Sequence, residues 1–143
     1  MRRFLIPLLL LASLALAACS GASSGPNEIV VKAEALKFSP ETIEVTAGKP
    51  VKLTFDNVDS LDHDLSVMEF PMEMTGATQV PLAGHDDMGN MGGMEPELHV
   101  AALMGQMATL EFTPTKPGTY EFFCTVAGHK EAGMKGTLVV KAP

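Results

Sequence analysis

The feature of the sequence that most restricts its fold is a succession of short runs of β-forming residues separated by Gly, Pro, Asn and Asp. Several runs alternate apolar and polar residues, so that Val51, Leu53 and Phe55 face one side of a strand. After residue 27 no stretch has the long 3.6-residue apolar period of a helix. This pattern predicts an all-β domain, built as a sandwich or barrel. Eight strands are expected, over residues 28–34, 42–46, 51–56, 64–68, 97–103, 107–112, 118–123 and 136–141.

The N-terminus has the pattern of a secretory signal. Two arginines precede an apolar run that ends at Ala18, and this run is too short for a spanning helix, so residues 1–18 are predicted to be a signal peptide. Cys19 follows two small residues, as in the lipobox of bacterial lipoproteins, and we expect it to be lipidated. A soluble secreted protein cleaved near Cys19 is the alternative.

Residues 19–27 are small and polar, which favours a lipidated flexible tether. Residues 28–143 are then one folded domain. This organisation predicts a bacterial protein of the cell envelope, held to a membrane by its lipid and facing the periplasm or the exterior.

The chain after the signal is strongly acidic. It holds eight lysines and all 17 Asp and Glu residues, a formal net charge of −9. Nucleic-acid binding needs basic patches, so this charge excludes it. An acidic surface suits docking on basic partner proteins, although solubility alone explains it equally well.

With the first cysteine committed to lipid, Cys124 is the one thiol left in the domain, which excludes an internal disulfide. Metal coordination would protect such a thiol from oxidation. Cys124, His129 and Met134 have the spacing C-x4-H-x4-M, a soft donor set that suits copper cycling between Cu(I) and Cu(II) better than it suits zinc. Gly128 and Gly133 each precede one of these residues and would allow tight bends of the backbone.

The segment GTYEFFC, the Cys–His–Met loop and the terminal β-strand resemble the cupredoxins, the family of plastocyanin, azurin, auracyanin and rusticyanin. The spacing is most similar to the auracyanin and rusticyanin branch, and the resemblance covers most of the chain after the tether. It implies a Greek-key β-sandwich of about eight strands, one type 1 (blue) copper and the transfer of single electrons. It also implies a further histidine ligand at an earlier junction of strand and loop, so that copper ties two sheets together.

His63 is expected to be this ligand, because it follows the alternating strand that ends at Asn57. His99 lies inside an alternating strand, where a structural role is expected, and His85 lies in a methionine-rich segment. The expected copper ligands are therefore His63, Cys124, His129 and Met134.

One position departs from the family pattern. The cupredoxins commonly have Asn after the first ligand histidine, whereas this sequence has Asp64. The family's Asn ties the two ligand loops together, and Asp64 is expected to accept a hydrogen bond from the Thr125 hydroxyl or from a backbone N–H. A carboxylate beside copper favours Cu(II) and lowers the reduction potential, unless it is protonated.

A methionine-rich loop insertion is expected over about residues 70–97. Within it His85 precedes Met88, Met91 and Met94, which recur every third residue. Thioethers are soft ligands, so these residues predict a Cu(I) loading or handover site. The preferred interpretation is a flexible loop that tolerates methionine, or a lid on the docking face.

An electron carrier is the main functional prediction, and a periplasmic copper chaperone or buffer that uses the methionine-rich loop is the alternative. A metal-free adhesion domain would leave Cys, His and Met on one loop without a purpose. An enzyme is disfavoured, because the sequence has neither the His-x-His pairs of multicopper oxidases nor a second thiol for a dinuclear copper centre.

Electrons are expected to pass through the exposed edge of His129. Val126, Ala127 and Ala132 are either a small apolar docking patch around it or merely small loop residues. The expected partners are redox proteins, such as a cytochrome, an oxidase or a reductase, and the protein itself is expected to be a monomer.

Overall fold

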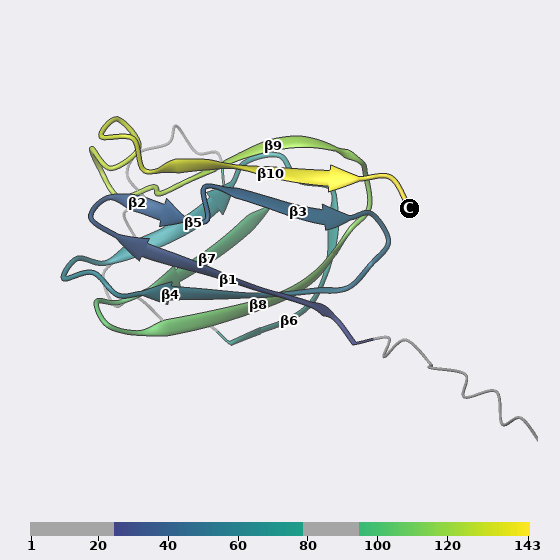
Figure 1. Ribbon diagram of the computed structural model, residues 1–143, viewed down its shortest axis with the longest axis horizontal. Helices are drawn as coiled ribbons and strands as arrows, with labels where there is room; N and C mark the ends of the chain where they lie inside the picture. The colour runs from purple at the N-terminus through teal and green to yellow at the C-terminus, as the bar shows by residue number, and fades with distance from the viewer. Residues whose placement is uncertain (1–24, 79–94) are drawn as a thin grey trace, which may run out of the picture.

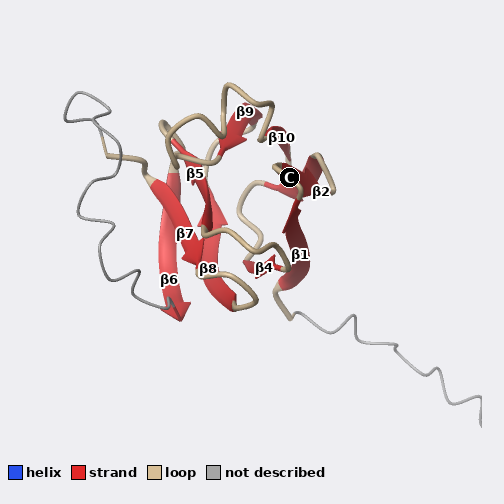
Figure 2. Cartoon of the chain, turned by 90° about the vertical axis from the view of Figure 1, so that its left-hand side faces the viewer, coloured by secondary structure: helices blue, strands red, loops and turns tan. Residues whose placement is uncertain are grey.

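The computed structural model describes residues 25–78 and 95–143, and every element in this part of the chain is a β-strand (Figures 1 and 2). Among these described residues no helix is long and apolar enough to span a membrane. The strands are β1 (Asn27–Glu34), β2 (Lys37–Ser39), β3 (Thr42–Thr46), β4 (Val51–Asn57), β5 (His63–Val67), β6 (Met72–Thr78), β7 (Leu98–Ala102), β8 (Met107–Pro114), β9 (Gly118–Phe123) and β10 (Lys135–Lys141).

The strands form two five-stranded sheets, in the orders β2-β1-β4-β8-β6 and β3-β10-β9-β5-β7. The pairs β1–β4 and β3–β10 are parallel, and the other pairs are antiparallel. The predicted all-β sandwich is therefore confirmed.

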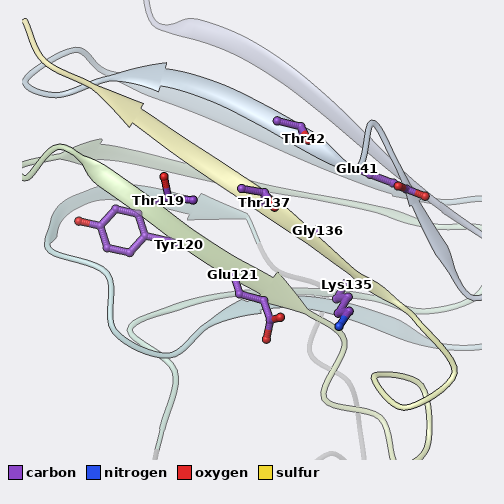
Figure 3. Close-up of a pocket in the computed structure, with 8 residues that line it drawn as sticks. All are labelled: Glu41, Thr42, Thr119, Tyr120, Glu121, Lys135, Gly136 and Thr137. Carbon is purple, nitrogen blue, oxygen red and sulfur yellow. The ribbon is translucent and has the colours of Figure 1, made fainter.

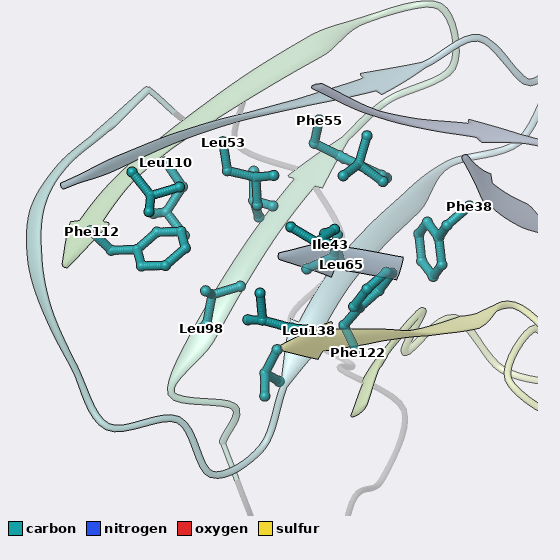
Figure 4. Packing of buried hydrophobic residues seen from close by; sticks show 14 of the residues in the cluster. Phe38, Ile43, Leu53, Phe55, Leu65, Leu98, Leu110, Phe112, Phe122 and Leu138 are labelled. Carbon is teal, nitrogen blue, oxygen red and sulfur yellow. The ribbon is translucent and has the colours of Figure 1, made fainter. Parts of the chain in front are cut away.

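The core lies between the two sheets (Figure 4). Alternate residues of β4 and β8 are buried, as their apolar–polar alternation predicts. Phe38 packs edge-on against Phe122, with ring centroids 5.2 Å apart, and its ring also lies 6.2 Å from that of Phe55. Each such side chain contributes about 1.5–3 kcal/mol by leaving water, so aromatic residues from both sheets hold the sandwich closed.

Each of the eight strands predicted from the sequence is present, with ends within two residues of the prediction. Strands β2 and β6 were not predicted, and β6 corrects the start of the loop expected over about residues 70–97. β6 forms an edge paired only with β8, with a register shift between Met74 and Gly76, and most of its side chains are exposed or only partly buried. Backbone hydrogen bonds rather than apolar burial define β6, so its sequence shows no clear alternation.

Several predicted features lie outside the described residues. These are the signal peptide, Cys19 with most of the tether, and the loop residues His85, Met88, Met91 and Met94.

The start of β1 and the segment that leads to His63 lie at opposite ends of the sandwich. β1 and β4 run in parallel, with Asn27 beside Val51, so the domain begins at the end of the sandwich where β4 begins. The chain then passes Asn57, at the opposite end of β4, before it reaches His63. In Figure 1 the C-terminus and the start of β1 lie on one side, and the loop between β9 and β10 lies on the other.

Candidate metal centre

Three potential metal ligands converge at the end of the sandwich opposite Asn27. One donor atom from each of His63, Cys124 and His129 lies within 4.8 Å of the others. The Nδ1 atoms of His63 and His129 are 3.2 Å apart, and Sγ of Cys124 lies 3.8 Å from the first and 3.5 Å from the second.

These separations fit a single metal ion. First-row metals such as zinc lie about 2.0–2.1 Å from imidazole nitrogen and about 2.3 Å from thiolate sulfur. One ion with bonds of that length would be compatible with the observed separations. Two imidazoles and a thiolate in such an arrangement are the donor set of a type 1 copper site.

Neighbouring strands of one sheet deliver these residues. His63 is the first residue of β5, Cys124 directly follows β9, and β5 pairs with β9 at Ser66 and Phe123. Since His129 and Met134 lie in the loop between β9 and β10 of this same sheet, the expectation that copper ties two sheets together is wrong. The ion would instead join β5 to the β9–β10 hairpin.

Backbone hydrogen bonds hold the Cys–His–Met loop in shape. The Cys124 N–H donates to the Met134 carbonyl at 3.1 Å, and the Met134 N–H donates to the His129 carbonyl at 2.9 Å. Gly128 and Gly133 have φ values of 83° and 102°, which confirms that glycine makes the bends before His129 and Met134. The Met134 side chain is fully buried, and its role as fourth ligand stays a prediction.

Asp64 joins the two ligand segments, as predicted. Its fully buried carboxylate accepts a hydrogen bond from the Thr125 N–H at 2.6 Å and another from the Thr125 hydroxyl. Nε2 of His99 on β7 lies 3.4 Å from the same carboxylate. His99 is therefore a structural histidine, as expected, but its partner is the residue beside the ligand His63.

Two residues that surround His63 were not predicted from the sequence. Asn57 donates two hydrogen bonds from Nδ2, to the carbonyls of Leu61 at 2.8 Å and Ala102 at 2.9 Å, and so closes the loop before β5. Asp59 places a carboxylate oxygen 3.1 Å from Nε2 of His63. Neither residue belongs to a recognisable motif, so spacing alone gave no signal for them.

The protonation of the ligands follows from their burial. In the metal-free protein burial raises the pKa of the Cys124 thiol to about 12, and the charge of Asp64 adds to the rise. Burial also lowers the pKa of His129, and electrostatic repulsion from His63 lowers it further. Burial disfavours the ionised form of Asp64, but hydrogen bonds from His99 and Thr125 outweigh it, so the pKa of Asp64 lies below its usual value. A metal must therefore displace a proton from Cys124.

The two histidines differ in exposure. His63 is fully buried, as is Cys124 apart from 1% of its surface, whereas His129 is only partly buried. Ala127 and Ala132 beside it are exposed. The ring of His129 is thus the ligand nearest to solvent.

One surface depression in the described part of the chain lies away from this site. It crosses β3, β9 and β10 and is lined by Glu41, Thr42, Thr119, Tyr120, Glu121, Lys135, Gly136 and Thr137 (Figure 3). No His, Cys or Met lines it, so it adds no soft metal ligand.

A β-sandwich with two histidines and one cysteine converging at the end of a sheet defines a small copper-binding domain of the type 1 kind. Residues 27–141 match the family of copper binding proteins of the plastocyanin/azurin type. The chain therefore belongs to this family, the cupredoxins, with copper as its cofactor at one type 1 site.

Individual relatives differ in what their names state. The copper-resistant cuproprotein CopI of Rubrivivax gelatinosus is 32% identical over 113 residues, which cover 78% of this chain and 64% of that protein. The chain therefore spans slightly less than two thirds of that relative. Plastocyanin of Dryopteris crassirhizoma is 34% identical over 107 residues, 73% of this chain and 88% of the plastocyanin. Among solved structures, auracyanin B has a TM-score of 0.58 and 26% identity, covering 80% of this chain and 88% of its own.

Proposed function

We propose that this protein is an electron carrier of the bacterial cell envelope, lipid-anchored through Cys19, that exchanges single electrons at a copper held by His63, Cys124, His129 and Met134. The observation that carries the proposal is the pairing of a buried, hydrogen-bonded cage with one ligand, His129, that reaches towards solvent. Copper supplies the Cu(I)/Cu(II) couple when bound.

The protein contributes rigidity to this exchange. The Asp64–Thr125 hydrogen bonds fix the Cys124 loop against β5, and the loop's own backbone bonds fix His129. A cage that moves little between the two oxidation states suits rapid electron exchange. His129 is the proposed route for electrons, with the exposed Ala127 and Ala132 and the partly buried Val126 around it as a small docking patch.

The orientation of the domain supports an anchored carrier. The described chain begins at the end of the sandwich opposite the ligands, so a lipid attached before residue 25 would join the domain at the end away from the copper. Leu61 and Met104 are 48% and 58% exposed, and the Met104 N–H donates to Asp62, the residue before His63. Apolar side chains are thus available to a partner at this end.

A visible absorption spectrum of the protein loaded with Cu(II), beside the Cys124→Ala variant, tests the copper site. An intense thiolate-to-copper band is expected that bleaches reversibly with reductant and is absent from the variant. A protein that binds Cu(II) without this band contradicts the proposal.

The net charge of −9 after the signal predicts that redox partners are attracted electrostatically. Basic redox proteins, such as a cytochrome with a positive surface, are the proposed partners. The bimolecular rate of electron exchange with such a cytochrome is then expected to fall steeply as ionic strength rises, because salt screens the attraction. A rate independent of salt opposes charge-guided docking.

Copper buffering or handover is the second candidate, favoured by the similarity to a copper-resistant cuproprotein. The two functions differ in copper exchange, since a carrier retains its ion through many redox cycles. Transfer of Cu(I) to a competing chelator measures this directly, with Met88, Met91 and Met94 replaced by Ile as the matched variant. Fast transfer that slows in the variant would support handover and oppose the carrier.

A further inference from the structure

The two ring nitrogens of His63 face different groups. Nδ1 points towards His129 and Cys124, at 3.2 Å from Nδ1 of the first and 3.8 Å from Sγ of the second. Nε2, on the far side of the ring, lies 3.1 Å from Oδ2 of Asp59. The ring is fully buried, so this nitrogen is shielded from solvent and has the Asp59 carboxylate as its partner.

Asp59 is itself held in place. Its N–H donates to Oδ1 of Asn57 at 3.1 Å, and its Oδ1 accepts a hydrogen bond from the Ser60 N–H at 2.6 Å. Asn57 in turn is tied to the carbonyls of Leu61 and Ala102. With Oδ1 engaged locally, Oδ2 is aimed at the His63 ring. The carboxylate is only 16% exposed, and its Oδ2 lies 3.1 Å from Nε2 of the ring.

We propose that Asp59 is the positioning residue of the copper site, acting through His63. Its carboxylate accepts the Nε2–H hydrogen bond, which fixes the tautomer that leaves the Nδ1 lone pair free for copper. A carboxylate on the outer nitrogen also makes the imidazole a stronger donor. A stronger donor stabilises Cu(II) more than Cu(I), so Asp59 lowers the reduction potential.

This role is distinct from that of Asp64. Asp64 binds Thr125 and lies near His99, and so fixes the Cys124 loop. Asp59 binds a ring nitrogen of a ligand directly. The two histidines therefore differ: His63 is buried and hydrogen-bonded to a carboxylate, whereas His129 is the ligand nearest to solvent.

The inference rests on copper binding at His63 and not on the carrier role. The variants Asp59→Asn and Asp59→Ala test it. Asp59→Asn keeps the shape of the side chain and removes its charge, and Asp59→Ala also removes the oxygen that accepts the hydrogen bond. Asp62→Asn is the matched control, since it removes a charge from the same loop at a carboxylate that accepts the Met104 N–H instead of touching the ring.

Cu(II) affinity is expected to fall about 10–100-fold in Asp59→Ala, a typical effect of removing such a partner. Cu(I) affinity should fall less, so the potential rises in Asp59→Ala and Asp59→Asn, and by more than in Asp62→Asn. In the Zn(II)-substituted protein, the slowly exchanging Nε2–H proton signal of His63 should be present in the wild type and lost in Asp59→Ala.

Equal losses of Cu(I) and Cu(II) affinity with an unchanged potential would show a merely structural role and overturn the proposal. The proposal would also be overturned if the reduction potential shifted no more in Asp59→Asn than in Asp62→Asn. Loss of any negative charge from this loop would then explain the shift. Should Asp59→Ala not fold, the isosteric Asp59→Asn decides. An absent thiolate–copper band in the wild type contradicts the proposed function, whereas an intact band with an unshifted potential in Asp59→Asn contradicts the role of Asp59 alone.

Discussion

At the scale of single residues, Asp64 places a negative charge next to the copper ligands where the family commonly has Asn. Its lowered pKa means that the carboxylate is ionised at neutral pH, so the charge acts on the metal. Asp64→Asn is therefore expected to raise the reduction potential, measured by redox titration. The buried amide can keep both contacts with Thr125, because its Oδ1 can accept the N–H and its Nδ2 can donate to the hydroxyl. The bonds are then no longer charge-assisted, which predicts a stability loss of about 1 kcal/mol.

The variant Thr125→Val separates charge from hydrogen bonding at the same place. It removes the hydroxyl that donates to Asp64 and leaves the charge, so its potential should stay close to that of the wild type. An unchanged potential in Asp64→Asn would show that this charge does not reach the copper.

The protonated thiol of Cys124 predicts how copper affinity depends on pH. Between neutral pH and its pKa of about 12, binding releases the thiol proton, so apparent affinity should rise about tenfold per pH unit. Because the pKa of His129 is lowered from 6.5, proton release from His129 should add to the slope only below pH 6.5. Chelator competition from pH 5 to pH 9 measures the slope, and a flat profile above pH 7 contradicts the prediction.

The ligand set was accessible to sequence analysis because three of its residues are close in the chain. Cys124, His129 and Met134 lie on one loop, where spacing alone carries the chemistry. The contacts of His99 with Asp64 and of Asp59 with His63 could not be predicted in this way. They form only when β5, β7 and the loop before β5 are folded.

At the scale of elements, the predicted strands have a pattern of buried side chains in their sequence, and the strands that were not predicted lack one. Strands β4 and β8 bury alternate residues, so apolar and polar residues alternate in their sequences. β2 has three residues, with only Phe38 buried, and β6 is an exposed edge strand. Where backbone pairing rather than side-chain burial makes the strand, composition gives little signal.

The hairpin of β9 and β10 depends on a close approach at Gly136. A Cβ atom at this position would lie 2.2 Å from the Phe122 ring and 2.5 Å from the Glu41 carbonyl oxygen. The carbonyl belongs to the backbone and accepts the Thr137 N–H at 2.8 Å, so it cannot move freely. Gly136→Ala is expected to destabilise the protein by about 1–3 kcal/mol through overpacking.

Chemical denaturation of the metal-free protein measures this effect. Gly25→Ala is the matched control, because nothing lies within 4 Å of the added atom. Equal unfolding midpoints for the two variants would show that the chain relaxes around Gly136 without cost.

At the scale of the whole molecule, the metal site joins elements that share little backbone pairing. β5 pairs with β9 only at Ser66 and Phe123 near the site, whereas β9 and β10 pair over six positions. A bound ion adds bonds between His63 on β5 and Cys124 after β9. Copper should therefore hold this end of the sandwich together.

This link predicts that copper stabilises the fold. A ligand that binds only the folded state adds about 4 kcal/mol when its free concentration is 1,000 times the dissociation constant. Thermal unfolding with and without copper should show a clear rise of Tm in the wild type. Cys124→Ala removes the thiolate and should abolish most of the rise, while it leaves the metal-free Tm comparatively little changed because a small apolar side chain replaces a buried thiol. An equal copper-dependent rise in both proteins would place the stabilising ion elsewhere in the chain.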